Sequence, residues 1–177
     1  DVYVPANVAR NFAWNFFADH YVEAVKSRAY NRYGEFDEKL QRGAWYTLHT
    51  CLSTILKLLA PICPFVTEAL WRELYSNKSI HLQPFPEEKK ELESNLKTLS
   101  TPFMNFNTAV WKYKKEKNIA LSQAVTATVY GPKDLRVFES DLKAMHKIQK
   151  IHFAEPTEKM KKNAQALDSD IFVIEEK

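Results

Sequence analysis

A long apolar stripe with helical spacing constrains this chain more than any other feature of its sequence. From residue 40 to residue 59, apolar side chains recur every three or four positions: Leu40, Ala44, Leu48, Leu52, Ile55 and Leu59. This is the period of an α-helix with one buried face. Pro61 and Pro64 follow at once and remove two backbone donors, so the helix must end before them. The stripe therefore predicts a mainly α-helical chain.

The segments on either side of the stripe also predict helices. After Pro5, apolar residues at helical spacing predict a first helix from about Ala6 to Arg32, which Gly34 ends. Asp37 is placed to cap the helix that carries the stripe. A shorter helix is expected to begin at Pro64 and to end near residue 77.

The middle of the chain predicts a crossover and one more long helix. Residues 79–86 alternate polar and apolar side chains and contain two prolines, which predicts an extended segment. Residues 92–113 carry a near-heptad apolar stripe, which predicts a helix packed against its predecessors. Pro102 leaves two alternatives: either Thr101 caps a fresh helix, or the long helix kinks there. We expect an antiparallel helical bundle of four or five helices over residues 1–118.

The last third of the chain has a different period. Residues 124–129 alternate in a way that predicts a strand, and residues 134–145 predict a helix. Residues 147–154 and 171–174 predict two further strands. A small α+β subdomain is therefore expected over residues 119–177, as an appendage that follows the bundle.

The composition argues against several classes of function. Three glycines in 177 residues are too few for a glycine-rich phosphate loop. Cys51 and Cys63 form neither a zinc cluster nor a disulfide framework, and the histidines lack the spacing of metal ligands on one helix face. We expect neither a metal nor a catalytic site. No apolar run is long enough to cross a bilayer, so no contact with a membrane is expected.

The start of the chain and its cysteines suggest where the protein works. The sequence begins at Asp1, without a methionine or a signal segment, and we interpret it as a piece of a longer protein. Both cysteines lie among apolar residues, as reduced buried thiols do, which suits the cytoplasm.

Basic residues interleaved with aromatic ones form the strongest candidate for a binding site. One such cluster runs from Lys26 to Tyr33 and another from Trp111 to Lys117, each at the end of a predicted helix. Lysine and arginine neutralise phosphates, and aromatic rings stack unpaired bases, so the clusters suit a folded RNA. The alternative is that the helix dipole favours basic residues in a last turn and that the rings belong to the core.

In three runs, residues 12–30, 56–71 and 79–86, the sequence resembles the anticodon-binding domain of class I aminoacyl-tRNA synthetases for branched aliphatic amino acids. The run from Phe12 to Tyr30 is similar to the first helix of that bundle. Residues 56–71 resemble its Leu-Ala-Pro-x-x-Pro-Phe-x-Thr-Glu-x-Leu-Trp signature, and residues 79–86 follow at the distance the family shows. Together with residues 111–114, these runs are most similar to the valyl-tRNA synthetases, and the α+β tail resembles the archaeal type.

The resemblance implies a parent enzyme that joins valine to tRNA(Val) with ATP and has a separate editing domain. A valine pocket cannot strongly reject an isostere that carries a hydroxyl, which is the physical need for editing. The catalytic and editing domains of the same parent chain would precede Asp1, and this fragment would hold the anticodon stem-loop without a cofactor. The alternatives are the equivalent domain of an isoleucyl- or leucyl-tRNA synthetase, or a helical module that binds a protein.

The residues that contact the tRNA are chosen on physical grounds. We expect Trp14 or Tyr30 to be a stacking platform, and Arg28 and Arg32 to contact bases or phosphates. Three further phosphate contacts are expected from the second cluster: Lys112, Lys114 and Lys115. The signature residues Pro61, Pro64, Glu68 and Trp71 are expected to be structural.

Overall fold

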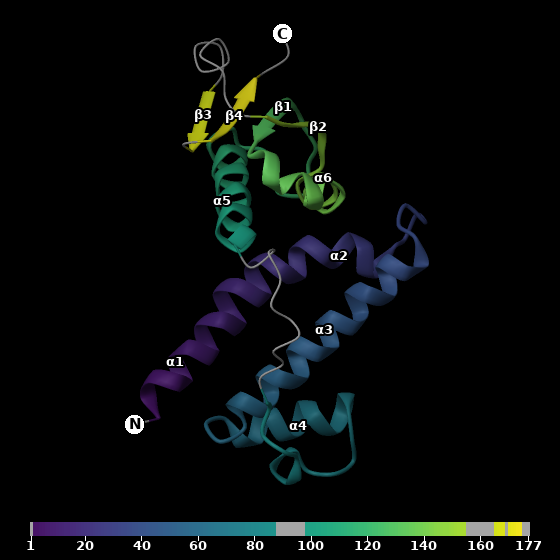
Figure 1. Cartoon of the computed structure of the whole chain (residues 1–177), viewed down its shortest axis with the longest axis vertical. Coiled ribbons are helices and arrows are strands. Elements are labelled where there is room, and N and C mark those ends of the chain that lie inside the picture. Colours follow the sequence, from purple (N-terminus) through teal and green to yellow (C-terminus); the bar gives the residue numbers. More distant parts are fainter. Residues whose placement is uncertain (1, 88–97, 155–164, 169, 175–177) are drawn as a thin grey trace. The chain divides into compact units, whose positions relative to one another are not determined.

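The computed structural model describes residues 2–87, 98–154, 165–168 and 170–174. The chain divides into two compact units, residues 1–92 and residues 93–177, and each is described by itself. The first unit is built of helices, and the second combines helices with a four-stranded sheet (Figure 1). The predicted mainly α fold is confirmed.

The helices of the first unit follow the predicted order. Helix α1 (Tyr3–Asn11), the π-helix η1 (Phe12–Val22) and α2 (Glu23–Tyr30) continue one another. Helix α3 (Glu38–Leu59) then returns beside α2, and α4 (Pro64–Leu74) packs on α3 (Figure 1). The predicted helix boundaries are confirmed to within about three residues.

The π-helical segment changes which side chains are buried. A π-helix bonds each residue to the one five positions along, so its turns are wider than those of an α-helix. Phe17 is therefore the buried residue of η1, whereas Phe12 and Phe16 stack on each other with ring centroids 5.5 Å apart. A regular α-helical spacing would instead place Phe12 and Phe16, four residues apart, together on one face.

The signature residues hold α4 against the segment that follows it. Trp71 is buried in a small core with Leu56, Ala60 and Ile80. The carboxylate of Glu68 accepts hydrogen bonds from Ser79 Oγ and Ile80 N, both at 2.9 Å. These residues fit the structural role expected of them. The extended crossover is wrong in one part, because Ile80–Leu82 forms the 3₁₀ turn η2.

The second unit contains a mixed sheet in the order β2-β1-β4-β3. Strand β1 (Val125–Gly131) pairs parallel with β2 (Ile148–Phe153) and antiparallel with β4 (Ile171–Ile174), which pairs antiparallel with β3 (Gln165–Asp168). The 3₁₀ helix η5 (Lys133–Phe138) and α6 (Glu139–His146) connect β1 to β2. Three of these strands and the connecting helix were predicted, and β3 was not.

Helix α5 (Ser100–Glu116) contributes four residues to the buried core of the second unit: Phe106, Ala109, Val110 and Tyr113. Its buried residues Phe106 and Val110 pack with Val129 of β1 and Leu142 of α6. The stripe from residue 92 is predicted to pack on the earlier helices. For the described helix this prediction is wrong, because its buried face lies against the sheet. Pro102 sits in the first turn of α5, as in a fresh helix, but no side chain caps the helix. Residues 92–97 lie outside the described residues.

By packing, then, the chain divides between residues 92 and 93. The sequence predicts the boundary between residues 118 and 119, before the first strand. The physical reason for the difference is that α5 buries its apolar face against strands that come later in the sequence. Residues 1–118 remain our proposal for the part that acts as the binding domain.

Candidate nucleic-acid interface

The corner between α2 and α3 is a short loop closed by its own side chains. Asn31 ends α2 in the left-handed conformation, with φ of 42°. Its side-chain amide donates to Phe36 O at 2.7 Å, and its Oδ1 accepts from Phe36 N at 3.0 Å. Asp37 then caps α3 by accepting from the first backbone amides of the helix. The sequence therefore fixes this corner locally.

Helix α3 holds the end of α2 through a single carbonyl. Trp45 Nε1 and Gln41 Nε2 both donate to Ala29 O, at 2.9 Å and 3.0 Å. This carbonyl is one of the last four of α2, which lack partners within the helix. The contacts therefore satisfy a helix end and fix the position of the residues that follow it.

Aromatic rings stand out from this rigid corner. Tyr30 is 71% exposed and Tyr33 is 81% exposed. Exposed rings on a fixed backbone lose little conformational freedom when a planar partner stacks on them, and unpaired RNA bases are such partners. The interpretation of this ring cluster as core is therefore wrong for Tyr30 and Tyr33.

Basic side chains surround the same corner. Arg32 is exposed, whereas Arg28 is half-buried and its Nε is shielded from solvent. Lys26 and Arg42 form exposed ion pairs with acidic residues on their own helices, at 3.2 Å and 2.6 Å. Such pairs contribute only about 0–1 kcal/mol, so either cation can turn to a phosphate at small cost.

Trp14 lies on the same helical rod but away from the corner. It is 68% exposed on the π-helical segment, and π-helical turns are frequent near functional sites. Trp14 and Tyr30 are 16 residues apart, which corresponds to about 24 Å along a helix that rises about 1.5 Å per residue. Trp14 and Tyr30 therefore cannot stack on the same base. The structure brings together Arg28, Tyr30 and Arg32, and leaves Trp14 apart.

The predicted lysines of α5 belong to the second unit and differ from one another. Lys112 and Lys115 are exposed. Lys114 is fully buried, and its Nζ donates to Leu121 O at 2.9 Å and to Gln123 O at 2.8 Å. Burial, and secondarily the charge of Lys147, lower the pKa of the Lys114 ammonium. Lys114 therefore holds the turn after α5, and the expected phosphate contact does not fit it.

Two further features of the described residues bear on the type of site. Within residues 2–87, 98–154, 165–168 and 170–174, no three His, Cys, Asp or Glu side chains come close enough to hold a metal ion. None of the helices in that part of the chain has the length and apolar character needed to cross a membrane.

Comparison with known proteins finds one matching family and several similar proteins. The family described as the anticodon-binding domain of tRNA ligase matches residues 1–129. A valine–tRNA ligase from Pyrobaculum aerophilum is 46% identical over 85% of this chain and 19% of its own length. One from Aeropyrum pernix is 42% identical, over 83% of the chain and 18% of its length. One from Mycolicibacterium paratuberculosis is 33% identical, over 75% of the chain and 14% of its length. The chain thus spans about a fifth of the length of the relatives it matches most strongly.

Proposed function

Because the chain belongs to the anticodon-binding domain family of tRNA ligases, we propose that it binds the anticodon stem-loop of tRNA(Val) as part of a valine–tRNA ligase. The observation that carries this proposal is the α2–α3 corner, where exposed rings and arginines project from a loop fixed by its own hydrogen bonds. The names of the matched relatives favour a valine enzyme over an isoleucine or leucine enzyme.

At this corner the aromatic and the basic side chains have different roles. Tyr30 offers a ring on which an unpaired anticodon base stacks, and Arg32 neutralises a neighbouring phosphate. Arg28, whose Nε is shielded from solvent, contacts the phosphate backbone of the same RNA. Trp14 is a further proposed stacking contact, and Lys112 and Lys115 are further proposed phosphate contacts. The corner thus combines sequence-tolerant stacking with charge.

The reaction itself belongs to other parts of the proposed parent chain. That chain would join valine to tRNA(Val) with ATP, and its editing domain would remove misloaded threonine. The fragment contributes by holding the tRNA, and we propose no cofactor and no catalytic residue within it. We also propose that the protein acts in the cytoplasm, an expectation that rested on reduced cysteines; both are free thiols, Cys51 half-buried and Cys63 exposed rather than buried.

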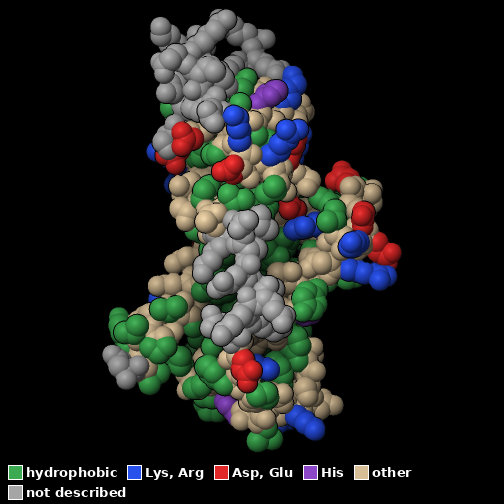
Figure 2. All heavy atoms as spheres, in the orientation of Figure 1, with side chains coloured by type: hydrophobic (Ala, Val, Ile, Leu, Met, Phe, Trp, Pro, Cys, Tyr) green, Lys and Arg blue, Asp and Glu red, His purple; other side chains and the backbone are tan. Residues whose placement is uncertain are grey.

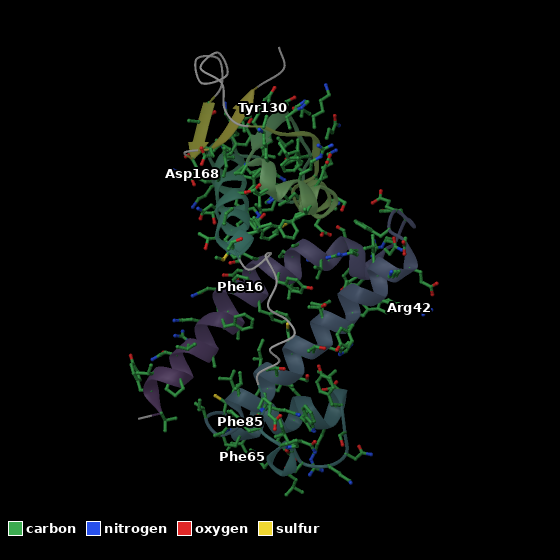
Figure 3. The ribbon with its side chains drawn as sticks, in the orientation of Figure 1. Phe16, Arg42, Phe65, Phe85, Tyr130 and Asp168 are labelled. Atoms are coloured by element: carbon green, nitrogen blue, oxygen red, sulfur yellow. The ribbon has the colours of Figure 1, made fainter. Side chains whose placement is uncertain are left out.

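We also propose that part of the first unit contacts the catalytic and editing domains. Apolar side chains stand exposed on α1 and near α4, and Figure 2 shows them gathered on the surface of this unit. Phe65 is 90% exposed and Phe85 is 64% exposed (Figure 3). Exposed apolar patches of this kind mark interaction sites, and the relative from Pyrobaculum aerophilum extends well beyond the 19% of its length that this chain matches.

The test is binding of the chain to valine tRNA transcripts that carry single anticodon substitutions, at two salt concentrations. A base reader predicts a loss of about 1–3 kcal/mol for a wrong anticodon. Arg32→Ala should lower the salt slope by about one, and Tyr30→Ala should weaken binding without changing the slope. Lys78→Ala, at the other end of the first unit, is the matched control and should change neither. Equal, salt-insensitive binding to every transcript would contradict the proposal.

A further inference from the structure

The carboxyl ends of β1 and β2 meet at one edge of the sheet. The two strands are parallel, Gly131 pairs with Phe153, and Ala154 N donates to Gly131 O at 3.1 Å. From Gly131 the chain continues through Pro132 into η5, which begins at Lys133. In open sheets of this kind, the carboxyl ends of parallel strands are where ligands bind.

Two aromatic rings are stacked at this edge. Tyr130 and His152 are register partners, and their ring centroids lie 5.3 Å apart with planes inclined by 21°. Their neighbours Val129 and Ile151 are buried in the core with α5 and α6. Because side chains alternate along a strand, Tyr130 and His152 face away from that core. His152 is exposed, and Figure 3 marks Tyr130 on this part of the sheet.

His152 also lines a hollow of about 240 Å³. The other lining residues come from η5, from the start of α6 and from β2: Arg136, Glu139, Ile151 and Phe153. Pockets that enclose a whole drug-sized ligand have roughly 300–1,000 Å³, so this hollow is too small for a complete nucleotide. A single planar ring is the size of group that it fits.

The charge around the hollow is mainly positive. Lys150 lies two residues before His152 on the same side of β2 and is exposed, as are Lys133 and Arg136 on η5. The acidic residue of the hollow, Glu139, accepts from Lys143 Nζ at 2.6 Å, so its charge is already paired. In Figure 2, lysine and arginine side chains gather beside a histidine on this unit. The surroundings therefore suit a phosphate more than a cation.

We propose that this edge of the second unit is a second RNA contact, which holds one unpaired base in the hollow. The base stacks on His152, whose ring is supported by Tyr130, and Lys150 meets a neighbouring phosphate. A stacked pair of aromatic rings beside a small hollow, with cations nearby, has the chemistry that binds a stacked nucleotide. The identity of the partner as an RNA rests on the proposed function, but the surface is separate from the α2–α3 corner.

The experiment uses the full chain with a valine tRNA transcript and with a single-stranded RNA that contains 2-aminopurine. His152→Ala should weaken binding by roughly 5- to 150-fold, the range for one base stacked on one aromatic ring. The salt slope should not change in this variant. Stacking on His152 should quench the fluorescence of 2-aminopurine. His152→Phe keeps a ring at the position and should restore both the affinity and this quenching. Lys150→Ala should lower the salt slope by about one, whereas Lys78→Ala, in the first unit, should not.

Each outcome decides the proposal. Unchanged binding by His152→Ala overturns it, and so does a loss that His152→Phe fails to restore. An equal effect of Lys78→Ala and Lys150→Ala would also overturn it, because binding would then follow net charge alone. If Tyr30→Ala and Arg32→Ala abolish binding while His152→Ala does not, the proposed function stands and this inference fails. Loss from His152→Ala with no effect from the corner variants would support this contact and contradict the corner.

Discussion

The two units of the chain differ in how completely they bury their apolar side chains. In the second unit, α5, α6 and the sheet enclose a continuous core that includes Phe106, Val129, Leu135 and Leu142, all fully buried. In the first unit, the described helices bury small clusters and leave many large apolar side chains in solvent. Of the exposed large apolar residues in the described parts, only Leu121 and Val137 belong to the second unit.

This difference indicates what the stability of each unit depends on. A helix pair buries one stripe of each helix, and the remaining apolar side chains need another partner or a function in solvent. A sheet with helices on one face closes its core by itself. We therefore expect the second unit to be stable on its own, and the first to gain stability from whatever covers α1 and α4.

Phe106→Ala should separate the two units most clearly. The ring is fully buried between α5 and the sheet, so its removal leaves a cavity and should cost about 3–5 kcal/mol. Hydrogen exchange followed by mass spectrometry should show lost protection in the second unit, with the first unit unchanged. Leu56→Ala, in the small core of the first unit, is the matched variant and should give the reverse pattern. Loss of protection in both units from Phe106→Ala would contradict their independence.

Gly131→Ala tests how tightly the core of the second unit is closed. A Cβ at this position would lie 2.8 Å from Phe106 Cε2, so the ring would have to move, at a cost of about 1–3 kcal/mol. The cost should shrink when Phe106 is replaced by the smaller leucine, since the obstructing ring is then absent. Denaturant unfolding of the single and double variants measures this coupling. Additive costs would show that the ring and the glycine do not compete for the same space.

The sequence predicted the helices well because their period is a local property. The stripe on α3, the cap at Asp37 and the prolines after residue 60 all act within a few residues. What a helix packs on is not local. The stripe of α5 has the same spacing whether it faces helices or a sheet, so its place in the second unit could not be read from periodicity. Strand β3 was missed because it is short and its alternation is weak.

The candidate site shows the same limit. The sequence located the cluster of rings and arginines at the end of α2, but not which rings are exposed or that Arg28 is half-buried. For Lys114 a usable signal existed. It follows Phe106 and Val110 at steps of four, so helical spacing places it on the buried face. Tyr130 and His152 gave no such signal, because only the register of two strands brings them together.

Lys114→Met tests the polar contact inside the second unit. The substitution keeps a long side chain but removes the two hydrogen bonds to Leu121 O and Gln123 O. Leaving buried carbonyls unpaired costs about 1–3 kcal/mol, and the relief of burying an ammonium offsets part of this. We expect a net loss of about 1–2 kcal/mol in denaturant unfolding. Lys115→Met, one residue later and exposed, should change stability by less than about 0.5 kcal/mol. Equal effects would mean that the buried lysine is not a structural anchor.

Glu68→Gln tests the corresponding polar contact of the first unit and should have the smallest effect. The hydrogen bond from Arg72, then that from Ile80 N, lowers the pKa of the Glu68 carboxyl to about 2, below its ordinary value of 4.5. A carboxyl with a lowered pKa stabilises the fold above its unfolded-state value, and this contribution is lost as the carboxyl is protonated. The melting temperature of Glu68→Gln should therefore lie below that of the native chain at pH 7, and the gap should close between about pH 4.5 and 2. Glu73→Gln, an exposed carboxyl on the same helix, should leave the melting temperature nearly unchanged. A difference in melting temperature that stays constant across this pH range would show that the contact of Glu68 with Ser79 and Ile80 does not depend on the charge of Glu68. The packing of α4 would then depend on Trp71 and its apolar neighbours.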